Sequence, residues 1–193
     1  GSALRGWAVA GALVLSVVAL VQGLRGPVVC DYEVRLAGLP AERDGTVLVE
    51  ISDIHLGTLI GERWMARLVN RVNAMKPDLV IVDGDLVDGS VHEVAPLLPV
   101  LKGLRAPLGV WAVTGNHEWY AGIDRSVRFL EDAGYTVLRD RWAEVAPGLV
   151  LAGVMAGRKS RERPSREAVA RAGLLLAGAL VALGPRIRAF GYD

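Results

Sequence analysis

The chain has 193 residues, of which 22 are basic and 21 are acidic, so its formal net charge at neutral pH is only +1. This near balance gives no overall positive field for nucleic acid, and we expect no nucleic-acid partner. A single cysteine, Cys30, excludes an intrachain disulfide, and with three histidines it also excludes a cysteine-rich zinc module. The length suits one domain of ordinary size, or one domain plus a membrane anchor.

The first segment of the chain is an uncharged stretch of 19 residues between Arg5 and Arg25. At about 1.5 Å per residue it forms a helix of roughly 28 Å, close to the ~30 Å hydrocarbon core of a bilayer. The alternative is a cleaved signal peptide, but its apolar region is usually shorter and is followed by a small-residue cleavage site. We therefore predict a transmembrane helix within residues 1–26 and a membrane location. The two flanking arginines do not indicate on which side of the membrane the rest of the chain lies.

The remainder of the chain alternates between apolar runs and helical stretches. Residues 27–45 are predicted to be an extended connector, because Pro40 and Gly45 mark turns in it. Strands are expected at 47–52, 78–82, 109–114, 135–138, 143–145 and 149–154. Helices are expected at 63–75 and 125–133, and at 91–104 with interruptions by two prolines. The alternation is typical of an α/β domain with a largely parallel sheet, which we place at residues 46–156.

Each of the three main strands is followed by a polar cluster. The clusters read SDIHLG from residue 52, DGDLVDG from residue 83 and GNHE from residue 115. Parallel strands bring their carboxyl ends to one edge of the sheet, where ligands bind in α/β folds. Asp, His and Asn are oxygen and nitrogen donors that suit Mn, Fe, Zn or Mg. Each motif alone also occurs as a turn or a helix cap, but the three together, each after a strand, indicate a metal site.

This series of motifs resembles that of the calcineurin-like metallophosphoesterases, whose pattern is D-x-H, then G-D-x-x-D, then G-N-H-E/D. The resemblance covers about residues 46–154, and with the N-terminal helix it is similar to the membrane-anchored bacterial branch of that family. It implies a four-layer αββα sandwich and a phosphoester hydrolase with two divalent metal ions. The implied activities are a phosphodiesterase or phosphatase, or a pyrophosphatase acting on lipid-linked precursors.

The resemblance also implies which residues hold the metals. Asp53 and His55 would bind one ion, and Asp85 would bridge both. Asn116 would bind the second ion through its carbonyl oxygen.

The catalytic residues that the resemblance implies are His117 and Asp88. Because adjacent side chains diverge, we do not expect His117 to bind the same metal ion as Asn116. His117 is instead placed to protonate the leaving oxygen of the substrate, and Asp88 would hold the imidazole ring of His117. Two roles stay open for Glu118, a support behind the ligands or a helix cap. We expect Asp83 to end a strand without binding metal, and His92 to face solvent.

The last part of the chain departs from the family pattern. The family has further histidines in its C-terminal half, whereas the histidines here are His55, His92 and His117. Residues 157–193 carry 8 basic and 3 acidic side chains and match no motif, so we treat them as an atypical basic and apolar segment. The alternative to an enzyme is a truncated or frameshifted homologue, a membrane-bound and weak metal binder without catalysis. We expect this chain to hydrolyse model phosphodiesters far more slowly than a relative that carries every histidine of the family pattern.

Overall fold

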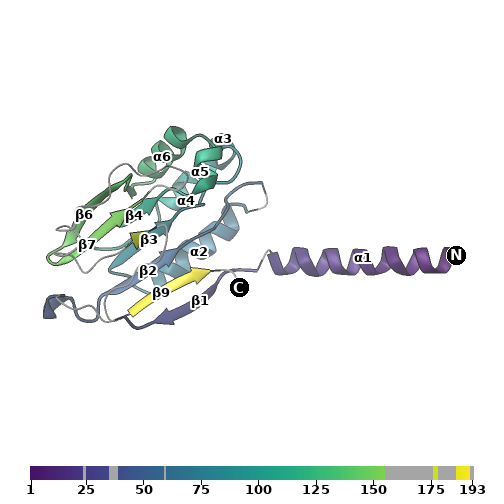
Figure 1. Ribbon diagram of the computed structural model, residues 1–193, viewed down its shortest axis with the longest axis horizontal. Coiled ribbons are helices and arrows are strands. Elements are labelled where there is room, and N and C mark those ends of the chain that lie inside the picture. The colour runs from purple at the N-terminus through teal and green to yellow at the C-terminus, as the bar shows by residue number, and fades with distance from the viewer. Residues whose placement is uncertain (24, 35–38, 59, 155–175, 178–185, 192–193) are drawn as a thin grey trace.

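The computed structural model describes residues 1–23, 25–34, 39–58, 60–154, 176–177 and 186–191, which form a mixed α/β arrangement (Figure 1). Its α-helices are α1 (Ser2–Gly23), α2 (Glu62–Ala74), α3 (Val91–Val94), α4 (Leu98–Leu101), α5 (Asn116–Tyr120) and α6 (Ile123–Asp132). Two short 3-10 helices are η1 (Ala41–Arg43) and η2 (Ala95–Leu97). The strands are β1 (Val28–Tyr32), β2 (Val47–Ile51), β3 (Leu79–Asp83), β4 (Val110–Val113), β5 (Thr136–Val137), β6 (Arg141–Ala146), β7 (Leu149–Gly153), β8 (Leu176–Ala177) and β9 (Arg186–Gly191).

The larger sheet has six strands in the order β1-β9-β2-β3-β4-β5. β2, β3, β4 and β5 run parallel to their neighbours, and β9 is also parallel to β2, whereas β1 is antiparallel to β9. The three main predicted strands are β2, β3 and β4, and they lie side by side. The expected α/β domain with a largely parallel sheet is confirmed, and the carboxyl ends of these strands share one edge.

Two apolar cores flank the larger sheet. Val80 and Val82 of β3 pack with residues of α2, α4 and α6 in one core, whereas Leu79 and Ile81 pack toward β6 and β7 in the other. Successive side chains of a strand point to opposite faces, so a strand buried on both faces reads as a continuous apolar run. This explains why β3 shows no polar alternation in the sequence.

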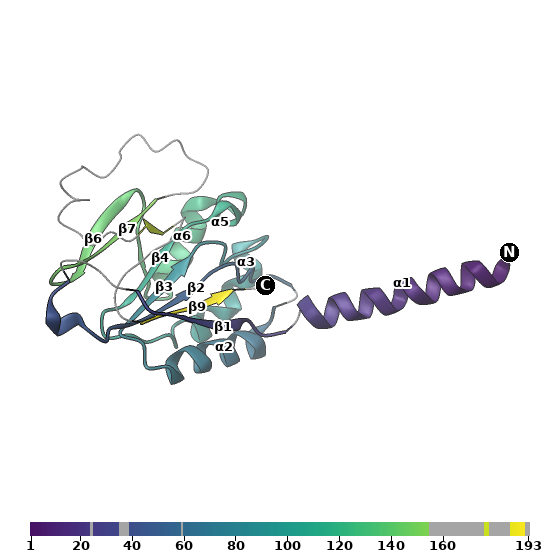
Figure 2. The ribbon, with the colours of Figure 1, turned by 60° about the horizontal axis from the view of Figure 1, so that its bottom comes forward.

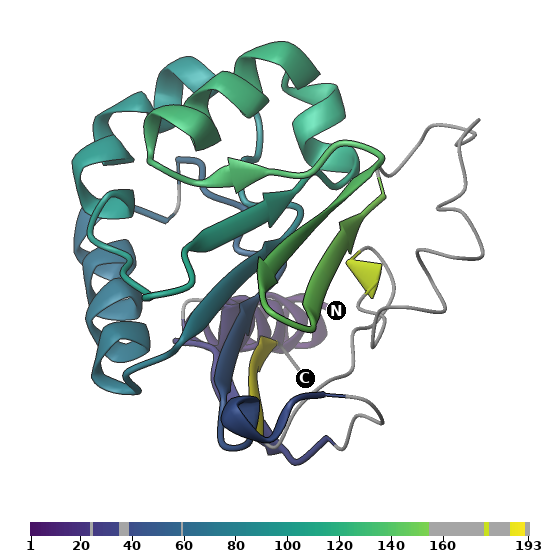
Figure 3. The ribbon, with the colours of Figure 1, turned by 90° about the vertical axis from the view of Figure 1, so that its left-hand side faces the viewer.

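The smaller sheet has the order β6-β7-β8, with β6 and β7 antiparallel. Figures 2 and 3 show helices on one side of the larger sheet and the β6–β7 hairpin on the other. These layers are consistent with the calcineurin-like sandwich. A helical layer outside the smaller sheet is not among the described residues, and the atypical segment at 157–193 lies outside them except for β8 and β9.

Two segments differ in detail from the sequence predictions. The stretch 91–104 forms α3, η2 and α4 in succession, with Pro96 and Pro99 in the first turns of η2 and α4. Proline is tolerated there because its missing N–H has no partner in a first turn. The segment expected as a connector also supplies β1. Val29 of this strand packs against the core that the sheet forms with α2, α4 and α6.

The helix α1 extends away from the rest of the chain (Figure 1). It has 22 residues, and none of its side chains is buried. By length and composition it is apolar enough to cross a membrane.

Candidate metal centre

The polar clusters lie at the shared carboxyl edge of β2, β3 and β4, here called the ligand edge. Asp53, His55 and Asp85 have φ angles of 55°, 51° and 48°, in a region that residues other than glycine rarely adopt. The loops after β2 and β3 run side by side, because the His55 N–H donates to the Asp85 carbonyl at 2.9 Å and the Leu56 N–H to the Leu86 carbonyl at 2.7 Å. Such conformations persist only where surrounding contacts fix them, and they cluster at functional sites.

Two glycines allow the loops after β3 and β4 to meet. Gly84 has a φ of 76°, and a Cβ placed on it would lie 2.8 Å from the backbone nitrogen of Gly115. A Cβ on Gly115 would lie 2.7 Å from Cγ of Asp85. Because such contacts are too short for real atoms, any side chain at Gly115 would displace the Asp85 carboxylate.

The buried side chain of Glu118 joins the loops after β3 and β4. Glu118 is 0% exposed, and its Oε2 accepts hydrogen bonds from the backbone N–H groups of Asp85 at 2.9 Å and Gly115 at 2.8 Å. Its Oε1 accepts from the Val87 N–H at 2.8 Å. Glu118 therefore takes both roles that the sequence left open: it caps the start of α5 and it supports the loop that carries Asp85.

Three of the four predicted metal ligands form one group. Asp53, His55 and Asp85 each offer a ligand atom, and these atoms lie within 4.8 Å of one another. Metal–ligand bonds to carboxylates and imidazoles are about 2.0–2.2 Å, so one divalent ion fits among atoms at this spacing. The fourth residue, Asn116, is exposed at the first position of α5. The Asp85 carboxylate also accepts a hydrogen bond from the backbone N–H of His117 at 2.9 Å, which links it to that helix.

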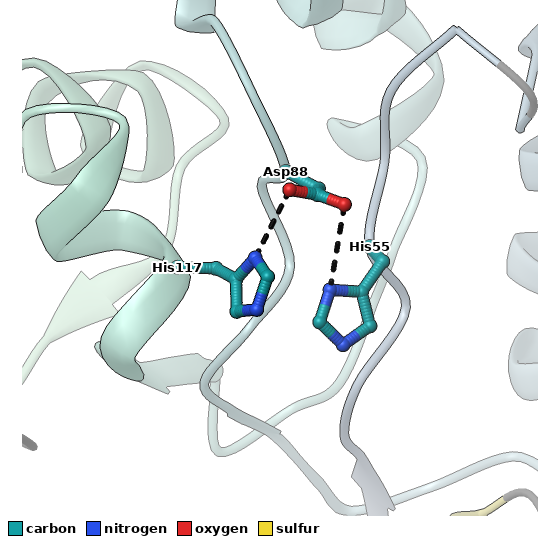
Figure 4. A group of neighbouring side chains, drawn as sticks. All are labelled: His55, Asp88 and His117. Atoms are coloured by element: carbon teal, nitrogen blue, oxygen red, sulfur yellow. Dashed lines mark hydrogen bonds and ion pairs between the residues drawn. The ribbon is translucent and has the colours of Figure 1, made fainter.

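A second group combines His55 with the two predicted catalytic residues (Figure 4). His117 Nδ1 lies 3.0 Å from Oδ1 of Asp88, and His55 Nδ1 lies 3.9 Å from Oδ2 of the same carboxylate. The two imidazole rings meet edge to face, with centroids 4.4 Å apart. Asp88 thus orients the ring of His117 through Nδ1, which leaves Nε2 of His117 to exchange a proton, whereas its distance to His55 is too long for a hydrogen bond. His92 belongs to neither group and is exposed on α3.

Two further carboxyl groups lie beneath the ligand edge. Burial, and then the hydrogen bond and negative charge of Asp83, raise the pKa of Glu50 to about 7. The Ser52 hydroxyl hydrogen-bonds to the Asp53 carboxylate and lies 3.2 Å from the carbonyl oxygen of Asp83. Asp83 lies at the end of β3, as the sequence predicted, but Glu50 was not predicted to belong to the site. The sequence feature that could have indicated Glu50 is its position as the single charged residue in the apolar run of β2.

The chain is similar in sequence to known proteins. Residues 46–175 match the family described as calcineurin-like phosphoesterase, so the match extends past the motifs themselves. A zebrafish (Danio rerio) protein named "Transmembrane protein with metallophosphoesterase domain" is 35% identical over 133 residues, which are 68% of this chain and 30% of that protein. An "Uncharacterized metallophosphoesterase" of Aquifex aeolicus is 39% identical over 107 residues, 55% of this chain and 41% of that protein. A Helicobacter pylori protein of the same description is 32% identical over 133 residues, 69% of this chain and 35% of its own length. The chain thus spans less than half the length of each of these relatives.

Proposed function

The chain belongs to the calcineurin-like phosphoesterase family, and on that premise we propose that it is a metal-dependent phosphoester hydrolase that α1 anchors in a membrane. The observation that carries the proposal is the convergence of Asp53, His55 and Asp85 at the ligand edge. A membrane location is further supported by the name of the zebrafish relative, which describes a transmembrane protein. The phosphoesterase domain would occupy residues 46–156, after an anchor at 1–26 and a connector at 27–45.

We propose that the site holds two divalent ions. Asp53 and His55 would hold one, Asp85 would bridge to the other, and Asn116 would bind that second ion. The imidazole among the ligands favours Mn or Zn, with Fe and Mg as further candidates. When bound, such ions lower the pKa of water and neutralise phosphoryl charge, which supports hydrolysis at neutral pH.

His117 is proposed to give a proton to the leaving oxygen of the phosphoester. Its ring projects from α5 beside the ligand group, and the 3.0 Å contact with Asp88 fixes the ring through Nδ1. This contact keeps the ring in one orientation, with its Nε2 atom away from Asp88. Asp88 acts through His117 in this proposal and does not itself contact the substrate.

The proposed substrate is a phosphodiester or phosphomonoester, including lipid-linked forms. The ligand edge that would take this substrate is open to solvent: the side chain of Asp53 is 58% exposed and that of Asp88 is 50% exposed.

The test is hydrolysis of a bis-aryl phosphate by the full chain with Mn²⁺, beside the variants His117→Ala and His92→Ala. Loss of a general acid should lower turnover by about 10²–10⁴-fold in His117→Ala. His92→Ala is the matched control and should keep the wild-type rate, because His92 is outside both groups. Equal turnover by wild type and His117→Ala would contradict the proposed role. A wild type without turnover when Mn²⁺, Zn²⁺, Fe²⁺ and Mg²⁺ are each supplied in turn would instead favour the non-catalytic homologue.

A further inference from the structure

The chain enters the larger sheet at the ligand edge. Val29 of β1 pairs with Phe190 of β9, and Phe190 pairs with Ile51, the last residue of β2. Ile51 is followed two residues later by Asp53. Because β1 runs antiparallel to β9, its first residues are level with the metal ligands, and the strand then leads away from them. A strand of the opposite direction would have brought α1 to the far edge.

The link between α1 and β1 is short. Four residues, 24–27, separate Gly23 from Val28. At about 3.3–3.6 Å per residue, even a fully extended link keeps the end of α1 within roughly 17 Å of the start of β1. The end of this link is also tied to α2, because Nη1 of Arg71 donates a hydrogen bond to the carbonyl of Pro27 at 2.7 Å. A bilayer spanned by α1 therefore lies nearer to the ligand edge than to the opposite edge.

Three exposed apolar side chains on two separate elements lie on the same edge. Outside α1, large apolar residues of the described part that are exposed are Val28, Tyr32, Trp119, Tyr120 and Trp142. Trp119 and Tyr120 follow His117 on α5 and are 47% and 76% exposed, and the Tyr120 ring lies 5.8 Å from the His117 ring. Val28, at the start of β1, is 51% exposed. Trp and Tyr are the residues that concentrate at membrane–water interfaces.

We propose that Val28, Trp119 and Tyr120, here called the rim, contact the headgroup layer of the bilayer that α1 spans. The ligand edge then faces the membrane surface, and the site acts on phosphoesters embedded in that surface in preference to those in solution. This inference rests on the proposed function and its anchor. It adds the orientation of the domain and the physical state of the substrate.

The contact is tested by fluorescence on the full chain in phosphatidylcholine vesicles that carry a nitroxide on the headgroup. In a Cys30→Ser background, Trp119→Cys and Trp142→Cys are each labelled with an environment-sensitive fluorophore. Trp142 is the matched control, because it is 54% exposed but lies on β6 of the smaller sheet. We expect headgroup quenching at position 119 and none at position 142. Absence of quenching at 119, or equal quenching at both positions, would overturn the proposed contact.

The substrate preference is tested with Trp119→Ser and Trp142→Ser on two substrates, a vesicle-embedded phosphoester and the soluble bis-aryl phosphate. Trp119→Ser should lower turnover of the embedded substrate about tenfold, as expected for one interfacial aromatic side chain, and leave the soluble one within about twofold. Trp142→Ser should change neither. An equal effect of Trp119→Ser on both substrates would overturn the inference while leaving the proposed function intact. A wild type inactive on both substrates would instead contradict the proposed function, and the fluorescence result would still decide the contact.

Discussion

The two ends of the same parallel strands carry similar polar residues but use them differently. At the end opposite the ligand edge, the Asn73 side chain donates to the Gly103 carbonyl at 2.7 Å and accepts from the Arg105 N–H at 3.1 Å. The Asp78 carboxylate there accepts from the Val47 N–H at 2.8 Å. These side chains join separate segments by hydrogen bonds to backbone groups. At the ligand edge, by contrast, carboxylates lie beside imidazoles, and Glu118 accepts hydrogen bonds from the backbone of the loop that carries Asp85.

A hollow in the surface lies at the opposite end. It has a volume of about 900 Å³, and its lining includes Asn73, Asp78 and Arg105. Because Asn73 and Asp78 already have backbone partners, they bind a ligand there only at the cost of those hydrogen bonds. What distinguishes the ligand edge is the convergence of carboxylates with imidazoles, and the hollow at the opposite end has no such group among its lining residues.

Among the substitutions that test this difference between the two ends, we expect Glu118→Ala to lower the free energy of unfolding most. The change leaves one buried and two partly buried N–H groups without their acceptor, at roughly 1–3 kcal/mol each, so a loss of about 3 kcal/mol or more in the free energy of unfolding is expected. Thermal unfolding of the full chain in detergent measures it, with the exposed Glu131→Ala on α6 as the control. Equal melting temperatures for the two variants would show that Glu118 does not support the ligand edge.

Gly115→Ala should disturb the geometry of the ligand edge without removing any metal ligand. The added methyl group displaces the Asp85 carboxylate, and a misplacement of about 1 Å can lower a catalytic rate about a hundredfold. Phosphodiester turnover and metal affinity should both fall. Gly61→Ala is the control, because a Cβ at Gly61 has nothing within 4 Å. Unchanged metal affinity in Gly115→Ala would mean that Asp85 does not need its present position.

Asn73→Ala tests the end of the strands opposite the ligand edge. It removes two hydrogen bonds that close a loop, which should lower the free energy of unfolding by about 1–2 kcal/mol. Metal content and turnover should stay at wild-type values, because Asn73 lies at the far end of the strands. A loss of bound metal in this variant would show that the two ends are coupled.

The smallest expected effect concerns Glu50. Its pKa in the folded chain is about 7, above the ordinary value of 4.5, so the folded state binds the proton more tightly than the unfolded state. Stability is then greatest below the ordinary pKa and falls as the pH rises through about 7. Glu50→Gln should remove this fall and be more stable than wild type by on the order of 1–2 kcal/mol at about pH 8. Melting temperatures of both forms across this pH range provide the test, and parallel curves would contradict it.

The sequence predicted the parts of the fold that depend on local pattern. β2, β3 and β4 are largely apolar runs, and their parallel pairing follows from the helices between them, so the clusters after them were expected at one edge. The pairing of β1 with β9 joins residues far apart in the chain, and β1 has no clear apolar alternation to reveal it.

Within the site, the sequence indicated residue types but not their backbone conformations. The positive φ angles of Asp53, His55 and Asp85 cannot be read from residue types that usually avoid that region. The role of Glu118 depends on which N–H groups surround it, and the pairing of Glu50 with Asp83 depends on strand register. Both arise from contacts between separate segments of the chain.

The central claim is that the ligand edge, and not the opposite end of the strands, binds a divalent metal. The most direct measurement is elemental analysis of the full chain after equilibration with Mn²⁺ and removal of free metal, for wild type, Asp85→Ala and Asp78→Asn. We expect bound metal in wild type and in Asp78→Asn, and none in Asp85→Ala, because Asp85 is the proposed bridging ligand. Equal metal content in wild type and Asp85→Ala, or loss of metal in Asp78→Asn alone, would contradict it.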